Sequence, residues 1–289
     1  MIFAIIGMGP YRVFSPVEWR ASPFSFPLII IYGCSWVIVI SCIMLSYRYL
    51  FSTAFYAVYI SSFALLIGSF GNLKNGILLE KDKFSYLKFK IATLTIVIGV
   101  IPLLLLSQNS ILNLRLGVDI ALYSETADAL LNNKSLDNLH GFAADCFFLH
   151  FRWGQPIFIA FLHKSLGLIS PVITKSYIYN ASLYGVIGLV SAFLMYSTSK
   201  MNLKWSLIGS VLIILNVNIF VVLTEGQWAH YLSIPLLIIY FNCWFLLRYS
   251  KNINLNTLKY ILTMALMLSA LLIVMSEIVP VIIAISIFY

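Results

Sequence analysis

The stretch from Gly117 to Gly154, GVDIALYSETADALLNNKSLDNLHGFAADCFFLHFRWG, interrupts an otherwise apolar chain. It holds half of the chain's ten acidic residues, which are Asp119, Glu125, Asp128, Asp137 and Asp145. Two of the four histidines, His140 and His150, also lie in it. A chain this apolar has few other places for polar chemistry. We therefore predict that catalysis or ligand binding draws on this segment.

The overall composition is typical of a membrane protein. The chain has 289 residues, of which 61% are hydrophobic and 10% charged, whereas a soluble domain carries about 25% charged residues. Because a spanning helix needs roughly 20 apolar residues, the length allows about eight spans. We predict an all-α polytopic membrane protein with about seven to eight transmembrane helices and a large first outer loop containing surface helices. The basic residues behind the net charge of +8 are scattered between apolar runs, which indicates topology signals rather than nucleic-acid binding.

The predicted spans follow the apolar runs of the sequence. They cover about 27–47, 49–70, 91–112, 177–198, 205–223, 228–247 and 258–275, and a further apolar run extends from Val279 to Tyr289. A tight turn at Arg48 joins the first two spans. The preceding residues 1–26 are mixed in polarity and are expected to lie along the membrane interface. We divide the chain into residues 1–90 and a module of residues 91–289 with an outer loop at 113–175. We expect that module to be incomplete at its C-terminal end.

Loop charges give the predicted orientation. The segment 71–90 carries five lysines against Glu80 and Asp82, and positively charged loops stay in the cytoplasm. With the N-terminus also inside, twelve of the eighteen basic residues lie inside and seven of the ten acids outside. The segment Gln155–Pro171 has a short apolar run that is broken by His163 and Lys164. We predict that it lies on the membrane surface, since a span here would invert the side of every later loop.

A helical periodicity divides the start of the outer segment into two faces. One face holds Asp119, Tyr123, Thr126, Ala127 and Leu130, and the opposite face holds Glu125 and Asp128. Asp119 follows the end of the third predicted span closely. It therefore either points back into a cavity at the bilayer surface or serves as the N-cap of a surface helix, for which Asp is a favoured residue.

Other polar residues predicted outside are candidates for ligand binding. Arg115 and Arg152 flank the acidic segment, and arginine forks suit either a substrate phosphate or ordinary lipid headgroups. Glu225 lies in a short outer turn, and Glu277 lies close to or within a span, next to the helix-breaking Pro280. The four cysteines and the outer histidines lack metal-ligand spacing, so we predict neither a metal site nor a disulfide framework.

The order of these features resembles the GT-C glycosyltransferases, multi-span enzymes that use polyprenyl-phosphate-linked sugars. The resemblance covers roughly Ile91 to Tyr240. It depends on Asp119, Tyr123, the run Ala127-Asp128-Ala129-Leu130, the turn Arg152-Trp153-Gly154-Gln155-Pro156 and the step Leu166-Gly167. The chain departs from the family where Ile120 replaces a frequent second acid and Gln155 replaces the first residue of a frequent double proline. Two spans also precede the motif, which usually follows the first span.

The resemblance implies a glycosyltransferase of the bacterial inner membrane, and the loop charges predict that its N-terminus is cytoplasmic. Asp119 would be the catalytic base, and the substrate-binding residues would be Arg115, Tyr123, Arg152, Glu225 and Glu277. The donor would be a polyprenyl-phosphate sugar, the acceptor a glycan or glycolipid, and no further cofactor or metal is implied. Two alternatives remain open: a polysaccharide polymerase or ligase, and a membrane transporter or flippase.

Overall fold

The structure is a computed structural model in which every described element is a helix. It describes residues 1–71, 86–95, 97, 118–132, 153–166, 186–187, 189–198, 201–214, 228–248 and 255–288. Within these ranges, the side chains of residues 21, 71, 118–122, 210, 214, 228–231 and 288 are not described. The labelled helices are α1 (Ile2–Phe14), α2 (Val17–Ala21), α3 (Ser25–Ser46), α4 (Phe51–Gly71), α6 (Val118–Leu131), α8 (Gly154–Leu166), α10 (Leu203–Ile214), α12 (Trp228–Arg248), α13 (Leu255–Val274), the short 3-10 helix η4 (Ser276–Ile278) and α14 (Val279–Phe288).

Three of the described helices are long and apolar enough to cross a membrane, namely Ser25–Ser46, Phe51–Phe70 and Leu255–Val274. Each corresponds within a few residues to a predicted span. Seven to eight spans are not confirmed, because several of the predicted ones, among them 91–112 and 205–223, fall partly outside the described residues. The predicted turn at Arg48 is confirmed. Arg48 has a positive φ of 64°, and the amide of Tyr49 donates to the carbonyl of Met44 across the end of α3 at 3.1 Å.

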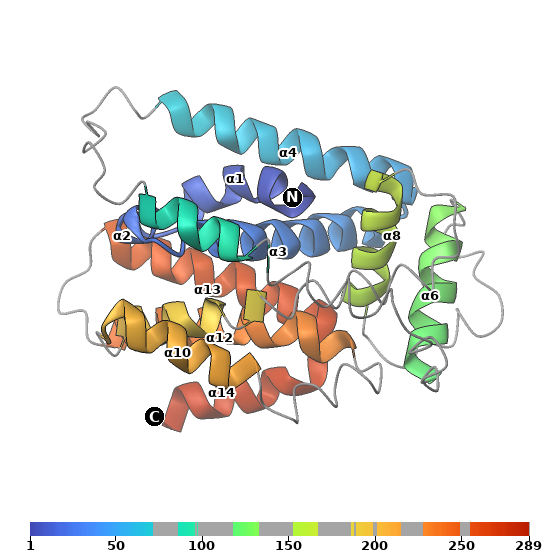
Figure 1. Cartoon of the computed structure of the whole chain (residues 1–289). Coiled ribbons are helices and arrows are strands. Elements are labelled where there is room, and N and C mark those ends of the chain that lie inside the picture. The colour runs from blue at the N-terminus through green and yellow to red at the C-terminus, as the bar shows by residue number, and fades with distance from the viewer. Residues whose placement is uncertain are drawn as a thin grey trace.

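Helix α1 belongs to the segment of residues 1–26, which was predicted to lie along the interface. It packs against both α3 and α4 and lies between them in Figure 1. A Cβ atom on Gly7 would lie 1.8 Å from the carbonyl oxygen of Ile29, and one on Gly33 would lie 1.9 Å from that of Phe3. Helix α1 and α3 therefore touch through their backbones, as small residues allow in membrane proteins. The sequence analysis did not predict this close fit, because length and hydropathy do not show it. The interfacial position of residues 1–26 stays a prediction.

The same kind of contact joins α1 to α4. A Cβ atom on Gly9 would lie 2.1 Å from the carbonyl oxygen of Ser62. The hydroxyl of Ser62 in turn donates to the carbonyl of Ile6 at 2.5 Å. Between α3 and α4, the indole nitrogen of Trp36 donates to the hydroxyl of Ser61 at 3.0 Å. Helices α1, α3 and α4 thus form one closely packed group.

Helix α13 joins this group to the C-terminal helices. It packs against both α12 and α3. The hydroxyl groups of Tyr32 and Thr263 share a hydrogen bond of 2.7 Å, and Thr263 donates to the carbonyl of Phe14 at 3.0 Å. On the far side of α12, the hydroxyls of Tyr240 and Ser286 lie 3.2 Å apart, which ties α12 to α14.

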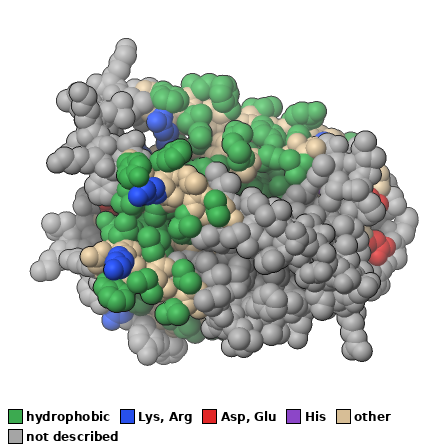
Figure 2. All heavy atoms as spheres, in the orientation of Figure 1, with side chains coloured by type: hydrophobic (Ala, Val, Ile, Leu, Met, Phe, Trp, Pro, Cys, Tyr) green, Lys and Arg blue, Asp and Glu red, His purple; other side chains and the backbone are tan. Residues whose placement is uncertain are grey.

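The described charged side chains are distributed unevenly between the two ends of the molecule. Helices α6 and α8 run across the end where α3 finishes, whereas α2 lies at the end where α3 begins (Figure 1). On the face shown in Figure 2, most of the coloured Lys and Arg side chains gather toward the α2 end. The coloured Asp and Glu side chains lie mainly at the α6 end.

The glycine contacts generate a stability prediction. Gly33→Ala places a methyl group against the backbone of α1, so the variant should lose about 1–3 kcal/mol of unfolding free energy through overpacking. The matched control is Gly68→Ala in α4, because nothing lies within 4 Å of a Cβ atom there. Alanine also favours helix over glycine, so the control should be as stable as wild type or slightly more so. Thermal unfolding of the full chain in detergent measures both, and equal midpoints for the two variants would contradict the packing.

Candidate functional site

Helix α6 forms the start of the predicted outer segment. It begins at Val118, so Asp119 lies in its first turn, one helical turn before Tyr123. This position is inside the helix rather than at the residue that precedes it, although helix boundaries are defined to within one or two residues. A carboxylate in the first turn is favoured by the helix dipole. The side chain of Asp119 is outside the described residues.

The predicted division of α6 into two faces is confirmed for the described side chains. Thr126, Ala127 and Leu130 are at most 2% exposed, and Tyr123 is 3% exposed. Glu125 and Asp128 are exposed, and Asp128 accepts a hydrogen bond from the side-chain amide of Asn132 at 3.1 Å. The two carboxylates therefore face away from the packed side of α6. Any group that acts at the protein interior must come from the other face.

Helix α8 covers the segment that was predicted to lie on the membrane surface. It has 13 residues, fewer than the roughly 20 that a span requires, and it crosses the ends of the long helices. Its first nine residues are all buried, which a helix lying free on a surface would not show. A Cβ atom on Gly154 would lie 2.4 Å from Cγ2 of Val274. The expected surface helix is thus an internal one, held between α6 and the ends of α3, α12 and α13.

Aromatic stacking fixes α8 against the N-terminal helices. The ring of Phe158 stacks on that of Phe3 in α1, with centroids 4.8 Å apart. Phe161 packs against Phe55 and Tyr59 of α4 at 4.9 and 5.6 Å. The ends of α1 and α4 therefore support α8, and α8 in turn supports α6.

Lys164 is a basic residue in the last turn of α8. Its ammonium lies over the rings of Phe51 and Phe55, at 5.9 and 5.3 Å from their centroids. Burial lowers the pKa of Lys164 below its usual value. The side chain is therefore engaged with α4, in a cation–π arrangement.

Glu277 lies in η4, between α13 and α14, and its side chain is exposed. The helix break differs from the prediction. The backbone departs from helical geometry at Met275, with φ −155° and ψ 77°, so the break precedes Glu277. Pro280 lies in the first turn of α14, where proline is tolerated because the amides there have no helical partner.

The remaining predicted site residues are not placed. Arg115, Arg152 and Glu225 fall outside the described residues. Tyr123 belongs to the buried core, and its part in binding a substrate stays a prediction. Within the described part of the chain, no three His, Cys, Asp or Glu side chains gather as metal ligands would.

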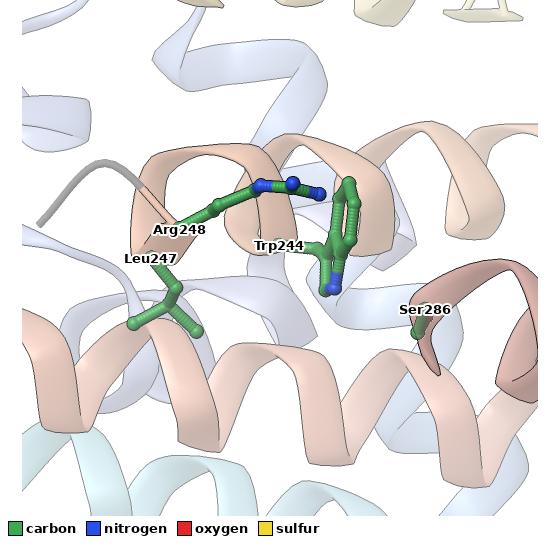
Figure 3. Close-up of a pocket in the computed structure, with 4 residues that line it drawn as sticks. All are labelled: Trp244, Leu247, Arg248 and Ser286. Atoms are coloured by element: carbon green, nitrogen blue, oxygen red, sulfur yellow. The ribbon is translucent and has the colours of Figure 1, made fainter. Parts of the chain in front are cut away.

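A pocket of about 410 Å³ opens between α12 and α14 and is lined by Trp244, Leu247, Arg248 and Ser286. Figure 3 shows the Arg248 guanidinium directed toward the Trp244 ring. Cζ of Arg248 lies 5.5 Å from the centroid of that ring. None of the described residues that line it is a predicted site residue. The pocket therefore adds no candidate catalytic group.

The sequence analysis missed a polar cluster around α2. The hydroxyl of Tyr260 donates to Oε1 of Glu18, and that of Tyr11 donates to the carbonyl of Trp19 at 2.6 Å. Arg20 donates to the carbonyls of Arg12 and Ser15. The sequence feature that could have indicated this cluster is the group of charged residues Arg12, Glu18 and Arg20, which follows an apolar run. Their partner in α13 is more than 200 residues away, so periodicity could not identify it.

We compared the whole chain with protein-family models, with curated proteins and with solved structures, and none of them matches it.

Proposed function

We propose that this protein is a membrane glycosyltransferase that transfers a sugar from a polyprenyl-phosphate donor to a glycan or glycolipid acceptor. The observation that carries the proposal is the geometry of α6. It is a two-faced helix across one end of a group of long apolar helices, and its exposed acids lie opposite the face on which Asp119 falls by periodicity. In this proposal α6 lies beside the headgroup region, where a lipid-linked donor presents its sugar.

In this proposal Asp119 acts on the acceptor. It accepts the proton of the acceptor hydroxyl while that oxygen attacks the anomeric carbon of the sugar, which requires hydrogen-bond distance between the two groups. The bond between the anomeric carbon and the donor phosphate oxygen breaks, and its electron pair leaves with the polyprenyl phosphate. Arg115 and Arg152 stabilise the charge that develops on this phosphate. Tyr123, Glu225 and Glu277 complete the substrate site.

The proposed location is the bacterial inner membrane, with the α6 end outside and the α2 end in the cytoplasm. This differs from the expected cytoplasmic N-terminus, because the start of α1 lies at the α6 end, where Phe3 stacks on Phe158 of α8. The separation of charge between the two ends supports this orientation, because basic residues concentrate on the cytoplasmic side. A lipid-linked donor would then be used at the outer face.

The first prediction tests the base. Asp119→Asn should lower transfer about 100- to 10,000-fold, the usual contribution of a general base. Folding should change little, since the loss of a carboxylate from the first turn of a helix costs only about 0.3–1 kcal/mol. The assay uses the full chain in lipid nanodiscs with labelled polyprenyl-phosphate hexoses and pentoses. Glu125→Gln and Asp128→Asn are matched controls on the exposed face, and both should retain nearly full activity. A fully active Asp119→Asn variant would leave Asp119 a structural role and remove the proposed mechanism.

The second prediction tests the orientation. In a chain whose four native cysteines are replaced, single cysteines are introduced at the exposed positions Asp128 and Lys204. A membrane-impermeant thiol reagent added to intact cells should label the cysteine at 128 and leave the one at 204 unlabelled until the cells are opened. Labelling of 204 alone would reverse the orientation and place the α6 end in the cytoplasm.

A further inference from the structure

The turn between α1 and α2 brings several positive charges together at the end of the molecule opposite α6. Arg20 donates to the carbonyls of Arg12 and Ser15, which places its guanidinium against the last turn of α1. The Arg12 guanidinium lies 4.5 Å from the centroid of the Phe70 ring. Burial lowers the pKa of Arg20, and repulsion by Arg12 contributes in the same direction. Two like charges are thus held close together in a partly buried place.

Within the described part of the chain, the groups around this turn do not balance its charge. Lys259 in α13 is close enough to Arg20 to interact with it electrostatically. Among the described residues, Glu18 is the carboxylate that attracts Lys259 electrostatically. Glu18 also accepts a hydrogen bond from the hydroxyl of Tyr260. The three cations and one carboxylate leave a net charge of +2. Such an excess is costly where water is partly excluded.

Several hydrogen-bond donors in the turn are buried without an acceptor. In the described structure, Nη1 of Arg12, Nε of Arg20 and the hydroxyl of Ser15 have no partner. Ser15 is 0% exposed, so water does not replace that partner. Buried polar groups are nearly always paired, and each of these three atoms offers a proton to an oxygen acceptor.

A purely structural role explains part of the arrangement. Arg20 satisfies carbonyls at the C-terminal end of α1, where a cation also interacts favourably with the helix dipole. This role uses one guanidinium nitrogen of Arg20. It leaves Nε of Arg20 and Nη1 of Arg12 without an acceptor, together with the positive excess.

We propose that the turn between α1 and α2 binds a phosphate group through the half-buried guanidiniums of Arg12 and Arg20. A phosphate supplies several oxygen acceptors and the negative charge that the cluster lacks, and arginine guanidiniums match its geometry. The source is either the headgroup of an anionic phospholipid, which lies at this level of a membrane, or free phosphate. The site is at the other end of the molecule from α6, so it does not depend on the proposed glycosyl transfer.

The test measures lipid and phosphate binding to the full chain in neutral detergent. Native mass spectrometry after incubation with equal amounts of phosphatidylglycerol and phosphatidylcholine should show the anionic lipid retained preferentially. Arg12→Gln should reduce this preference about tenfold, the usual effect of losing a charged hydrogen bond. Arg20→Gln should act similarly. If it fails to fold because it supports α1, Arg12→Gln still carries the test, since it leaves the backbone contacts of Arg20 in place.

The matched control is Arg248→Gln, which removes an exposed arginine that also lies over an aromatic ring. It should leave the lipid preference unchanged. Inorganic phosphate, compared with sodium chloride at equal ionic strength, distinguishes the sources. If phosphate displaces the lipid and raises the unfolding temperature of wild type but not of Arg12→Gln, the site accepts free phosphate. If it does neither while Arg12→Gln still loses the lipid, the site is specific for the headgroup. No preference in wild type, or equal losses in Arg12→Gln and Arg248→Gln, would overturn the proposal.

Discussion

The backbone contact between α1 and α3 is the interaction on which the rest of the structure depends. Gly7 and Gly33 let the two helices meet with no side chain between them. Between apolar helices in a membrane there is little hydrophobic driving force, so such close packing is a main source of stability. Once α1 is held in this way, its N-terminal end stacks Phe3 on Phe158 of α8. Its C-terminal end presents Arg12 and leads into α2. One helix therefore connects the acidic end of the molecule to the basic end.

Buried hydrogen bonds then join the two halves of the chain. Tyr32 of α3 and Thr263 of α13 are paired, and Thr263 also donates to the carbonyl of Phe14 at the end of α1. These groups would be costly to bury alone. Their pairing specifies which faces of α1, α3 and α13 meet, a selection that apolar contacts make poorly because leucine-like side chains are interchangeable.

The parts of the fold that follow from local periodicity could be predicted from the sequence. The long apolar runs gave α3, α4 and α13 within a few residues, and the 3.6-residue period correctly divided the described residues of α6 between buried Tyr123 and exposed Glu125. Features that depend on distant partners could not be predicted. The burial of α1 needs the small residues of α3, and α8 is internal because α6 and the long helices cover it. The cluster around Glu18 needs Tyr260. Of the candidate site, the sequence supplied a helix and its faces, while Arg115, Arg152 and Glu225 remain outside the described residues.

We propose that α4 is oriented across the membrane, whereas α6 lies at one end of the long helices and does not cross it. Spin labels measure this directly through their collisions with oxygen, which concentrates in the bilayer, and with a water-soluble nickel complex. Labels at the exposed α4 positions Tyr56, Ile60, Phe63 and Ile67 should show oxygen accessibility that rises to a maximum and falls again. Labels at Glu125, Asp128 and Asn132 of α6 should all be accessible to the nickel complex and show no gradient along the helix. A graded, oxygen-rich profile along α6 like that of α4 would contradict the account.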